Sequence, residues 1–292
     1  MSLLSIGHLI DRSWEFYRAQ FRVYMQVSGW LIVIAILNVV ALVLYPTAGA
    51  ISYHDHLTRT ETIGVVLYAL TNFILSPLLG FFLFLMLAQT ASKLTRGESV
   101  DVAAIMRTSK KIYLSTAVVV LLIGLMLLFA QIITLGPSIL IGILGAMLPN
   151  ATLLAVANLL FMAGLFLSAI LTTRWAVSYL MAPYANILDG AQKKSALTQS
   201  ESMIRGKFWA VFFRFLLPKF VFLLFGLFLG TILSILIQVL INGSAGLNLD
   251  AALRLTNLTE AVIPILVTIL INPLFIVSDV LLYTSLKGEP AV

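Results

Sequence analysis

Long apolar stretches are the feature that most constrains the fold of this chain. A stretch of about twenty apolar residues spans the ~30 Å hydrocarbon core of a membrane as a helix. Six such stretches follow one another, approximately over residues 27–45, 63–91, 114–135, 153–180, 220–241 and 261–283. We therefore predict an all-α integral membrane protein with six transmembrane helices.

Composition excludes the soluble alternatives. Hydrophobic residues make up 61% of the 292 residues and charged residues only 10%, against roughly 45–50% and 25% in a typical soluble domain. A soluble chain of this length cannot hide so much apolar surface, because about a quarter of its unfolded surface stays exposed. The expected solvent is lipid, which excludes a cytosolic enzyme, a nucleic-acid-binding protein and a secreted module.

The basic residues lie almost entirely on one side of the predicted spans. Of the 18 Lys and Arg residues, all but Arg59 and Arg254 fall on the side that holds both chain ends. Since basic loops stay in the cytoplasm, we expect both termini to be cytoplasmic in a bacterial inner membrane. The net charge of +6 is expected to contact anionic membrane lipids and no nucleic acid.

Proline and glycine predict where the spans break. The third span is expected to break at Gly136-Pro137, which leaves residues 138–148 as a short capping or re-entrant piece. Prolines within or beside other spans could open a polar cavity by freeing backbone carbonyls. These residues are Pro77, Pro218 and Pro273.

Three segments between the spans have the residue spacing of amphipathic helices that lie in the membrane interface on its cytoplasmic face. They cover residues 3–24, 102–113 and 194–215. Aromatic side chains favour the headgroup region of a membrane. The residues expected to anchor these helices there are Trp14, Tyr17, Phe21, Phe208 and Trp209.

Short matching patterns indicate an internal repeat within a single membrane domain, residues 1–292. The spacing Ser13-x4-Arg18-x2-Phe21 recurs as Ser200-x4-Arg205-x2-Phe208. Each pair of spans also ends at a glycine, where a positive φ would end the helix and turn the chain. These glycines are Gly97, Gly190 and Gly288. We therefore predict three units of the same orientation, approximately residues 1–97, 98–190 and 191–288.

The sequence contains no recognisable catalytic motif. It has no cysteine, no His-Glu-x-x-His pattern, no Gly-x-Ser-x-Gly pattern and no P-loop lysine. His54-Asp55-His56 is the only histidine cluster, and we interpret it as a solvated loop because a closed metal site takes four ligands. We expect no metal, no cofactor and no enzymatic activity.

Ionisable groups in or near the spans are the best functional candidates, because a charge in lipid is costly and usually has a reason. Asp279 lies in the cytoplasmic half of the sixth span. The alternative is structural: basic side chains reach the interface and Asp279 forms an ion pair with one of them. The basic residues that could bind a lipid headgroup or another anion are Arg18, Arg174, Arg205, Lys207, Arg214 and Lys219.

One stretch carries a family resemblance. It combines Ala182-Pro183-Tyr184, Leu188-Asp189-Gly190, Ala196-Leu197-x2-Ser200 and Arg205-Gly206-Lys207-Phe208-Trp209. With the opening Ile6-Gly7 through Asp11-Arg12-Ser13-Trp14 to Phe21 and the closing Leu282-Tyr283 before Lys287, it resembles the membrane domain of some bacterial glycerophosphoryl diester phosphodiesterases. The YciC-type multi-pass proteins are similar. The resemblance implies a six-span inner-membrane bundle, without the catalytic barrel, for which 292 residues leave no room.

These observations predict a non-enzymatic membrane protein with a lipid-interacting or scaffold role in the bacterial envelope. The alternative is a carrier or channel for a small or anionic solute. That alternative is based on the prolines and on the charged residues near the spans, namely Arg174, Arg214, Lys219 and Asp279.

Overall fold

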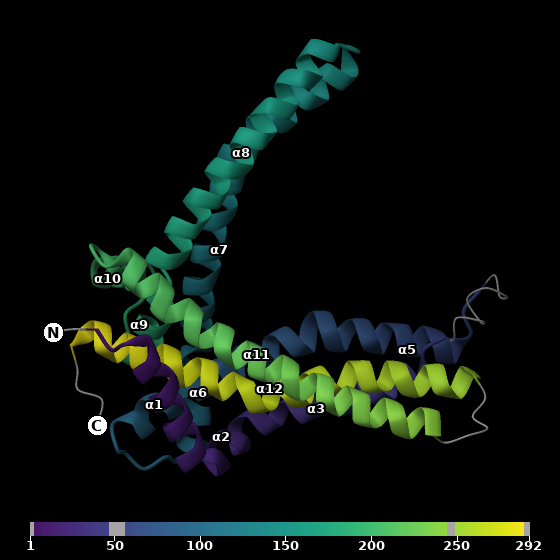
Figure 1. The fold of residues 1–292 in the computed structure, drawn as a ribbon, viewed down its shortest axis with the longest axis vertical. Coiled ribbons are helices and arrows are strands. Elements are labelled where there is room, and N and C mark those ends of the chain that lie inside the picture. The colour runs from purple at the N-terminus through teal and green to yellow at the C-terminus, as the bar shows by residue number, and fades with distance from the viewer. Residues whose placement is uncertain (1–2, 47–55, 244–248, 289–292) are drawn as a thin grey trace. The chain divides into compact units, whose positions relative to one another are not determined.

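The computed structural model describes residues 3–46, 56–243 and 249–288. Helix is the only regular secondary structure in these ranges and makes up 89% of the structure (Figure 1). The predicted all-α class is therefore confirmed.

Six helical segments of the described chain are long and apolar enough to cross a membrane, as the sequence predicts. They are Phe21–Leu44, Arg59–Thr95, Val102–Met147, Ala151–Asp189, Phe208–Gly243 and Ala251–Lys287. The first combines α2 (Phe21–Ser28), a 3₁₀ turn and α3 (Ile32–Leu44). The second combines α5 (Arg59–Leu70), a π-helical turn (Thr71–Leu75) and α6 (Ser76–Thr95).

The later spans are built from longer helices. They are α7 (Val102–Met147), α8 (Ala151–Ser178) with the short α9 (Ala182–Asp189), α11 (Phe208–Gly243) and α12 (Leu249–Lys287). Two further helices lie outside the apolar segments: α1 (Ile6–Ala19) and α10 (Lys194–Ile204).

The predicted break at Gly136-Pro137 is wrong, because α7 continues through Pro137 to Met147. Proline removes one helical hydrogen bond, here the bond to the carbonyl of Ile133 four residues earlier, and membrane helices tolerate such a loss. Nearby hydroxyl groups bond to other carbonyls of the same helix: Thr134 Oγ1 donates to Ala130 O at 2.8 Å and Ser138 Oγ donates to Leu135 O at 2.7 Å. Residues 138–147 therefore extend the third span and are not a re-entrant piece.

Three prolines of the later spans also lie in continuous helix. α11 continues through Pro218, and α12 continues through Pro264 and Pro273. Pro77, in contrast, follows an irregularity, because the π-helical turn Thr71–Leu75 comes directly before α6. The wider turn gives the proline ring room against the preceding carbonyls.

Two of the segments expected to be interfacial helices have different boundaries. Residues 102–113 form the first part of α7, because no glycine or proline separates them from the third span. Residues 194–215 divide between α10 and α11 at Arg205–Lys207, where Gly206 has φ +76°. That conformation favours glycine and ends a helix.

The three glycines expected at helix ends have positive φ, which confirms this prediction. The φ angles are +72° at Gly97, +72° at Gly190 and +75° at Gly288. After α6, Glu98 N donates to Lys93 O at 3.0 Å and Gly97 N donates to Leu94 O at 3.1 Å. This pair of bonds satisfies carbonyls that the last turn of the helix leaves free.

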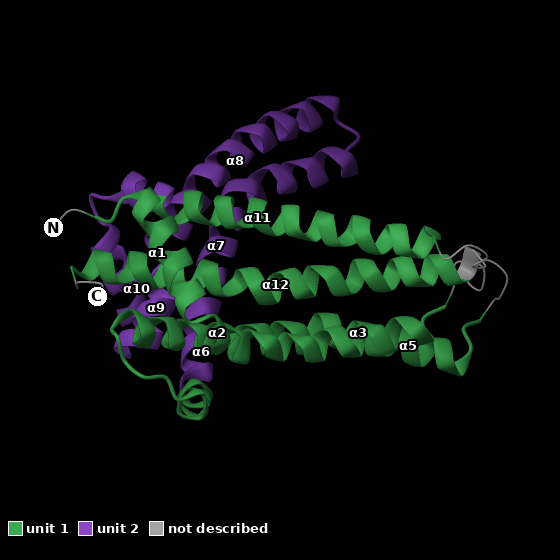
Figure 2. Cartoon of the chain, turned by 60° about the horizontal axis from the view of Figure 1, so that its bottom comes forward, with its two compact units in different colours: residues 1–111, 214–292 green, residues 112–213 purple. Residues whose placement is uncertain are grey.

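The chain divides into two compact units (Figure 2): unit 1 is Met1–Lys111 with Arg214–Val292, and unit 2 is Ile112–Phe213. In unit 1, α12 packs against α1, α3 and α6. Its eight residues from 276 to 283 are all buried. α12 is therefore the central helix of unit 1.

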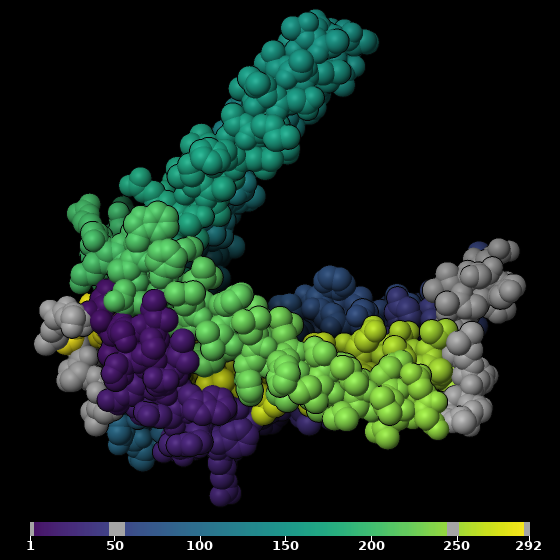
Figure 3. Space-filling model, in the orientation of Figure 1, coloured from purple at the N-terminus to yellow at the C-terminus, as the bar shows by residue number. Residues whose placement is uncertain are grey.

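Unit 2 contains α7 from Ile112 onward and the whole of α8, which together form a hairpin that Figure 3 shows as a narrow rod. Its two helices approach closely at Gly164, where an added Cβ would lie 2.4 Å from Thr134 O. Gln131 links the helices as well: it donates to Thr172 Oγ1 at 2.8 Å and accepts from Ser168 Oγ at 2.7 Å. Glycine and uncharged polar groups therefore hold the hairpin together.

Candidate functional site

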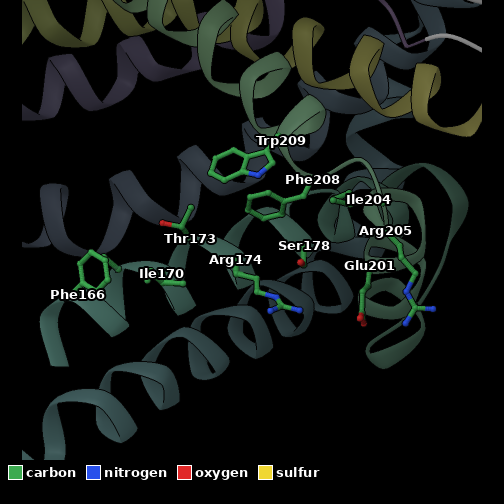
Figure 4. A pocket seen from close by; sticks show the side chains of 12 residues that line it. Phe166, Ile170, Thr173, Arg174, Ser178, Glu201, Ile204, Arg205, Phe208 and Trp209 are labelled. Atoms are coloured by element: carbon green, nitrogen blue, oxygen red, sulfur yellow. The ribbon is translucent and has the colours of Figure 1, made fainter. Parts of the chain in front are cut away.

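A hollow of about 760 Å³ lies within unit 2. Its walls come from the second half of α8, from α10 and from the first residues of α11. Figure 4 shows Phe166 and Ile170 at one end and Glu201 and Arg205 at the other, with Arg174 between them. The hollow therefore has an apolar end and a charged end.

Two arginines give the charged end its character. Arg174 comes from α8, and Arg205 follows the last residue of α10. Within the described residues, neither guanidinium forms a hydrogen bond or an ion pair with the rest of the protein. A guanidinium offers five N–H donors in a planar fork that matches a carboxylate or a phosphate. The hollow therefore presents unused donors suited to an anion.

Aromatic rings form much of the apolar lining. Phe166 belongs to α8, whereas Phe208 and Trp209 are the first two residues of α11. The rings of Phe208 and Trp209 meet edge to face, with centroids 5.2 Å apart. The Trp209 side chain is 65% exposed. This surface is suited to hydrocarbon chains and to the interface region of a membrane.

Ser200 fixes α10 against the end of α8. Its hydroxyl donates to Ser178 O at 2.8 Å and accepts from Met181 N at 3.1 Å, and its side chain is fully buried. The left-handed Gly206 then reverses the chain between Arg205 and α11. These two features bring Arg205 and the aromatic pair to the same hollow as Arg174.

The structure therefore brings together four of the residues that the sequence identified: Arg174, Arg205, Phe208 and Trp209. Glu201 also lines the hollow, and sequence reasoning missed it. The spacing of Glu201 and Arg205, four residues apart, was the available signal, since it would put both on one side of the helix expected over residues 194–215, although in the structure Arg205 follows the last residue of α10.

The other basic candidates lie elsewhere. Arg18 on α1 and Lys207 at the turn before α11 are exposed and do not line the hollow. Arg214 Nε donates to Leu4 O at 2.7 Å. Lys219 Nζ lies 2.8 Å from Asp279 Oδ2 and 3.7 Å from the centroid of the Phe215 ring. Arg214 and Lys219 therefore contribute to contacts within unit 1.

The Lys219–Asp279 pair is the principal buried charge pair of unit 1. The Asp279 side chain is 6% exposed and the Lys219 side chain 27% exposed. Asp279 lies among apolar neighbours on the buried part of α12. A carboxylate in such a place is tolerated because a cation compensates its charge.

The aromatic residues of the N-terminal segment have different exposures. Trp14 and Phe21 are exposed, as headgroup anchors would be, whereas Tyr17 is buried. Burial raises the pKa of the Tyr17 phenol to about 12. Tyr17 therefore contributes to packing within unit 1, where its ring lies 5.4 Å from that of Phe21 and 5.8 Å from that of Trp14.

The histidine cluster lies mostly outside the described residues, since His54 and Asp55 are not among them. Among residues 3–46, 56–243 and 249–288, no group of three or more His, Cys, Asp or Glu residues is placed to hold a metal ion.

The fold and the hollow together define a class: an all-helical chain with six helices able to cross a membrane and an amphipathic hollow in one of its two units. Comparisons of the chain with models of protein families, with curated proteins and with solved structures found no match.

Proposed function

We propose that this protein is a non-enzymatic, multi-pass membrane protein that binds an anionic membrane lipid in the hollow of unit 2. One observation carries the proposal: Arg174 and Arg205, without partners among the described residues, line a hollow whose remaining walls are largely apolar and aromatic. A molecule that satisfies both parts must carry an anionic head and a hydrocarbon tail.

The charge distribution supports the same occupant. Arg174, Arg205 and most other basic residues belong to the side of the spans that the positive-inside rule assigns to the cytoplasm. Anionic lipids of the cytoplasmic leaflet attract basic groups by about 1 kcal/mol for each Lys or Arg near the surface. We therefore place both termini and the hollow on the cytoplasmic side of a bacterial inner membrane.

The internal repeat forms part of this proposal. Ser13 and Ser200 are both fully buried, and Arg18 and Arg205 are both exposed. Phe21 begins α2 just as Phe208 begins α11. In both copies, a short helix with exposed charges precedes an apolar helical segment long enough to cross a membrane. We propose that α1 and α10 are equivalent helices of the membrane interface.

The resemblance to the membrane domain of glycerophosphoryl diester phosphodiesterases and to YciC-type proteins is compatible with a lipid-binding role. It adds no catalytic residue to the hollow, so we propose binding and not hydrolysis.

The carrier or channel alternative has less support. It drew on prolines that would interrupt the spans, but the helices continue through Pro137, Pro218 and Pro273. It also drew on Lys219 and Asp279, which bind each other.

The test is lipid binding by the full chain in nanodiscs made of phosphatidylcholine with a small fraction of phosphatidylglycerol, with bound lipid counted by native mass spectrometry. The Arg174→Gln/Arg205→Gln variant is expected to bind the anionic lipid about 150-fold more weakly, because hydrogen bonds from two charged groups to the head contribute about 3 kcal/mol together. The matched control is Lys194→Gln/Lys207→Gln, which removes the same charge from exposed positions of unit 2 that do not line the hollow.

An equal loss in both double variants would show that general surface charge binds the lipid, and the hollow would not be the site. Unchanged binding in the arginine variant would overturn the proposal. Brominated acyl chains give a second readout, because they quench the fluorescence of nearby tryptophan. A brominated lipid in the hollow is expected to quench a larger fraction of the fluorescence of the wild type than of the Trp209→Phe variant.

A further inference from the structure

Glu201 is the feature of the hollow that a simple anion site does not explain. It lines the same charged end as Arg205, on the side of Figure 4 away from Phe166. Arg205 lies just beyond the last residue of α10, where its ψ of 125° takes the chain out of the helix, and no ion pair joins it to Glu201 in the described structure. A carboxylate beside a bound anion repels it, and a hydrogen-bond donor on the ligand would offset that repulsion.

The formal charge of the site restricts the ligand. Arg174 and Arg205 contribute +2 and Glu201 contributes −1, which leaves +1 at the charged end. A phosphomonoester carries about −1.5 to −2 near pH 7, so Glu201 would repel its second charge. A zwitterionic head has no net charge and would leave the +1 uncompensated. A phosphodiester with an uncharged substituent carries −1 and neutralises the site.

The hydrogen-bond donors and acceptors of the hollow restrict the ligand further. An ionised carboxylate only accepts hydrogen bonds, so Glu201 needs a donor on the ligand. A hydroxyl group supplies that donor without adding charge. Ser178 also lines the hollow, and its hydroxyl can both donate and accept. The charged end is therefore suited to a phosphate beside a polyol.

We propose that the lipid head recognised by the hollow is a phosphodiester that carries hydroxyl groups, the chemistry of phosphatidylglycerol. Arg174 and Arg205 bind the phosphate, and Glu201 accepts hydrogen bonds from the hydroxyl groups. This inference rests on the proposed function, since it names the headgroup class for the same hollow.

The experiment compares two lipids of equal charge. Phosphatidylglycerol and phosphatidylmethanol are both phosphodiesters of charge −1, and only the former has head hydroxyl groups. Each is added to phosphatidylcholine nanodiscs that hold the full chain, and bound lipid is counted by native mass spectrometry. The wild type is expected to prefer phosphatidylglycerol by about tenfold, the size of one hydrogen bond to a charged group.

Glu201→Ala is expected to abolish this preference, by weakening phosphatidylglycerol binding and strengthening phosphatidylmethanol binding. Glu98→Ala, which removes an exposed carboxylate of unit 1, is expected to leave the preference unchanged. An equal affinity of the wild type for both lipids would overturn the inference, as would a preference for phosphatidylethanolamine over phosphatidylglycerol, because an ammonium group would then be the partner of Glu201.

The outcomes separate this inference from the proposed function. If the wild type binds both lipids equally and the Arg174→Gln/Arg205→Gln variant loses the binding of both, the hollow binds anionic lipids without distinguishing their headgroups, and only the inference fails. If the arginine variant keeps its affinity for both lipids, the proposed function fails as well.

Discussion

The central helix of unit 1 and the α7–α8 hairpin of unit 2 have similar apolar composition but are buried to different extents. In the most apolar window of Ala251–Lys287, 39% of the residues are buried, against 17% in the corresponding windows of Val102–Met147 and Ala151–Asp189. Hydropathy therefore indicates that a helix can enter a membrane, but it does not indicate whether protein or lipid surrounds the helix.

The two regions also differ in the polar groups that they bury. Unit 1 contains the Lys219–Asp279 ion pair and an amide pair, in which Asn72 Nδ2 donates to Asn38 Oδ1 at 2.8 Å. The α7–α8 hairpin uses Gln131 and two hydroxyl groups, without charge. The Asp279 carboxylate lies on the buried part of α12, which packs against several helices of unit 1, whereas the two-helix hairpin pairs uncharged groups between its own helices.

The largest effect is expected for the charge pair of unit 1. Asp279→Ala leaves the partly buried Lys219 without its carboxylate, and we expect a loss of about 3 kcal/mol in the free energy of unfolding. Unfolding in detergent mixtures of increasing SDS fraction, followed by circular dichroism, measures this change.

Two variants test the interpretation. Lys219→Met/Asp279→Leu removes both charges and is expected to recover most of the stability. Glu15→Ala, at an exposed position on α1, is expected to change it little. If Asp279→Ala were as stable as the wild type, lipid or water would solvate Lys219 well enough without its carboxylate partner.

The next effect is expected in the hairpin, at its closest helix contact. Gly164→Ala places a Cβ against Thr134 O, and we expect a loss of about 2 kcal/mol from overpacking. The matched change Gly124→Ala, in α7 where a Cβ would meet no atom within 4 Å, is expected to be neutral or stabilising because alanine favours helix. Equal effects would mean that the two helices are not held at this distance.

The smallest effect is expected for the uncharged polar link. Gln131→Leu removes two interhelical hydrogen bonds, and we expect a loss of about 1 kcal/mol, the scale of such bonds in membrane helices. Asn72→Leu makes the equivalent change in unit 1. The same SDS titration compares the two variants, and an unchanged stability in Gln131→Leu would contradict the role of these hydrogen bonds in holding the hairpin together.

The sequence was sufficient to predict the six apolar helices and the three glycine helix ends, because length, hydropathy and the freedom of glycine at positive φ are local properties. It failed at Pro137, since a proline removes a single hydrogen bond and a helix in a membrane can continue through it. It also failed to divide residues 194–215 at Gly206, although a glycine between two helical patterns is a signal for a helix end.

The hollow could be predicted only in part. Arg174 and Arg205 stood out because charges near apolar spans are rare. Their proximity depends on the hydrogen bonds of Ser200 to Ser178 and Met181, which connect residues about twenty positions apart. No periodicity or composition reports such a contact.

Unit 1 consists of two stretches of the chain on either side of unit 2, and this arrangement has a consequence for its synthesis. Arg214 holds Leu4 O, Leu4 N donates to Ser285 Oγ at 3.1 Å, and α1 packs on α12. Helix α1 thus has its principal partner in α12, which is synthesised after the other described helices. Unit 2, encoded between them, can assemble while the ribosome is still translating, but the part of unit 1 that precedes it keeps an incomplete core until α12 is made. Loss of α12 would therefore affect α1, the described helix farthest from it along the chain, most strongly.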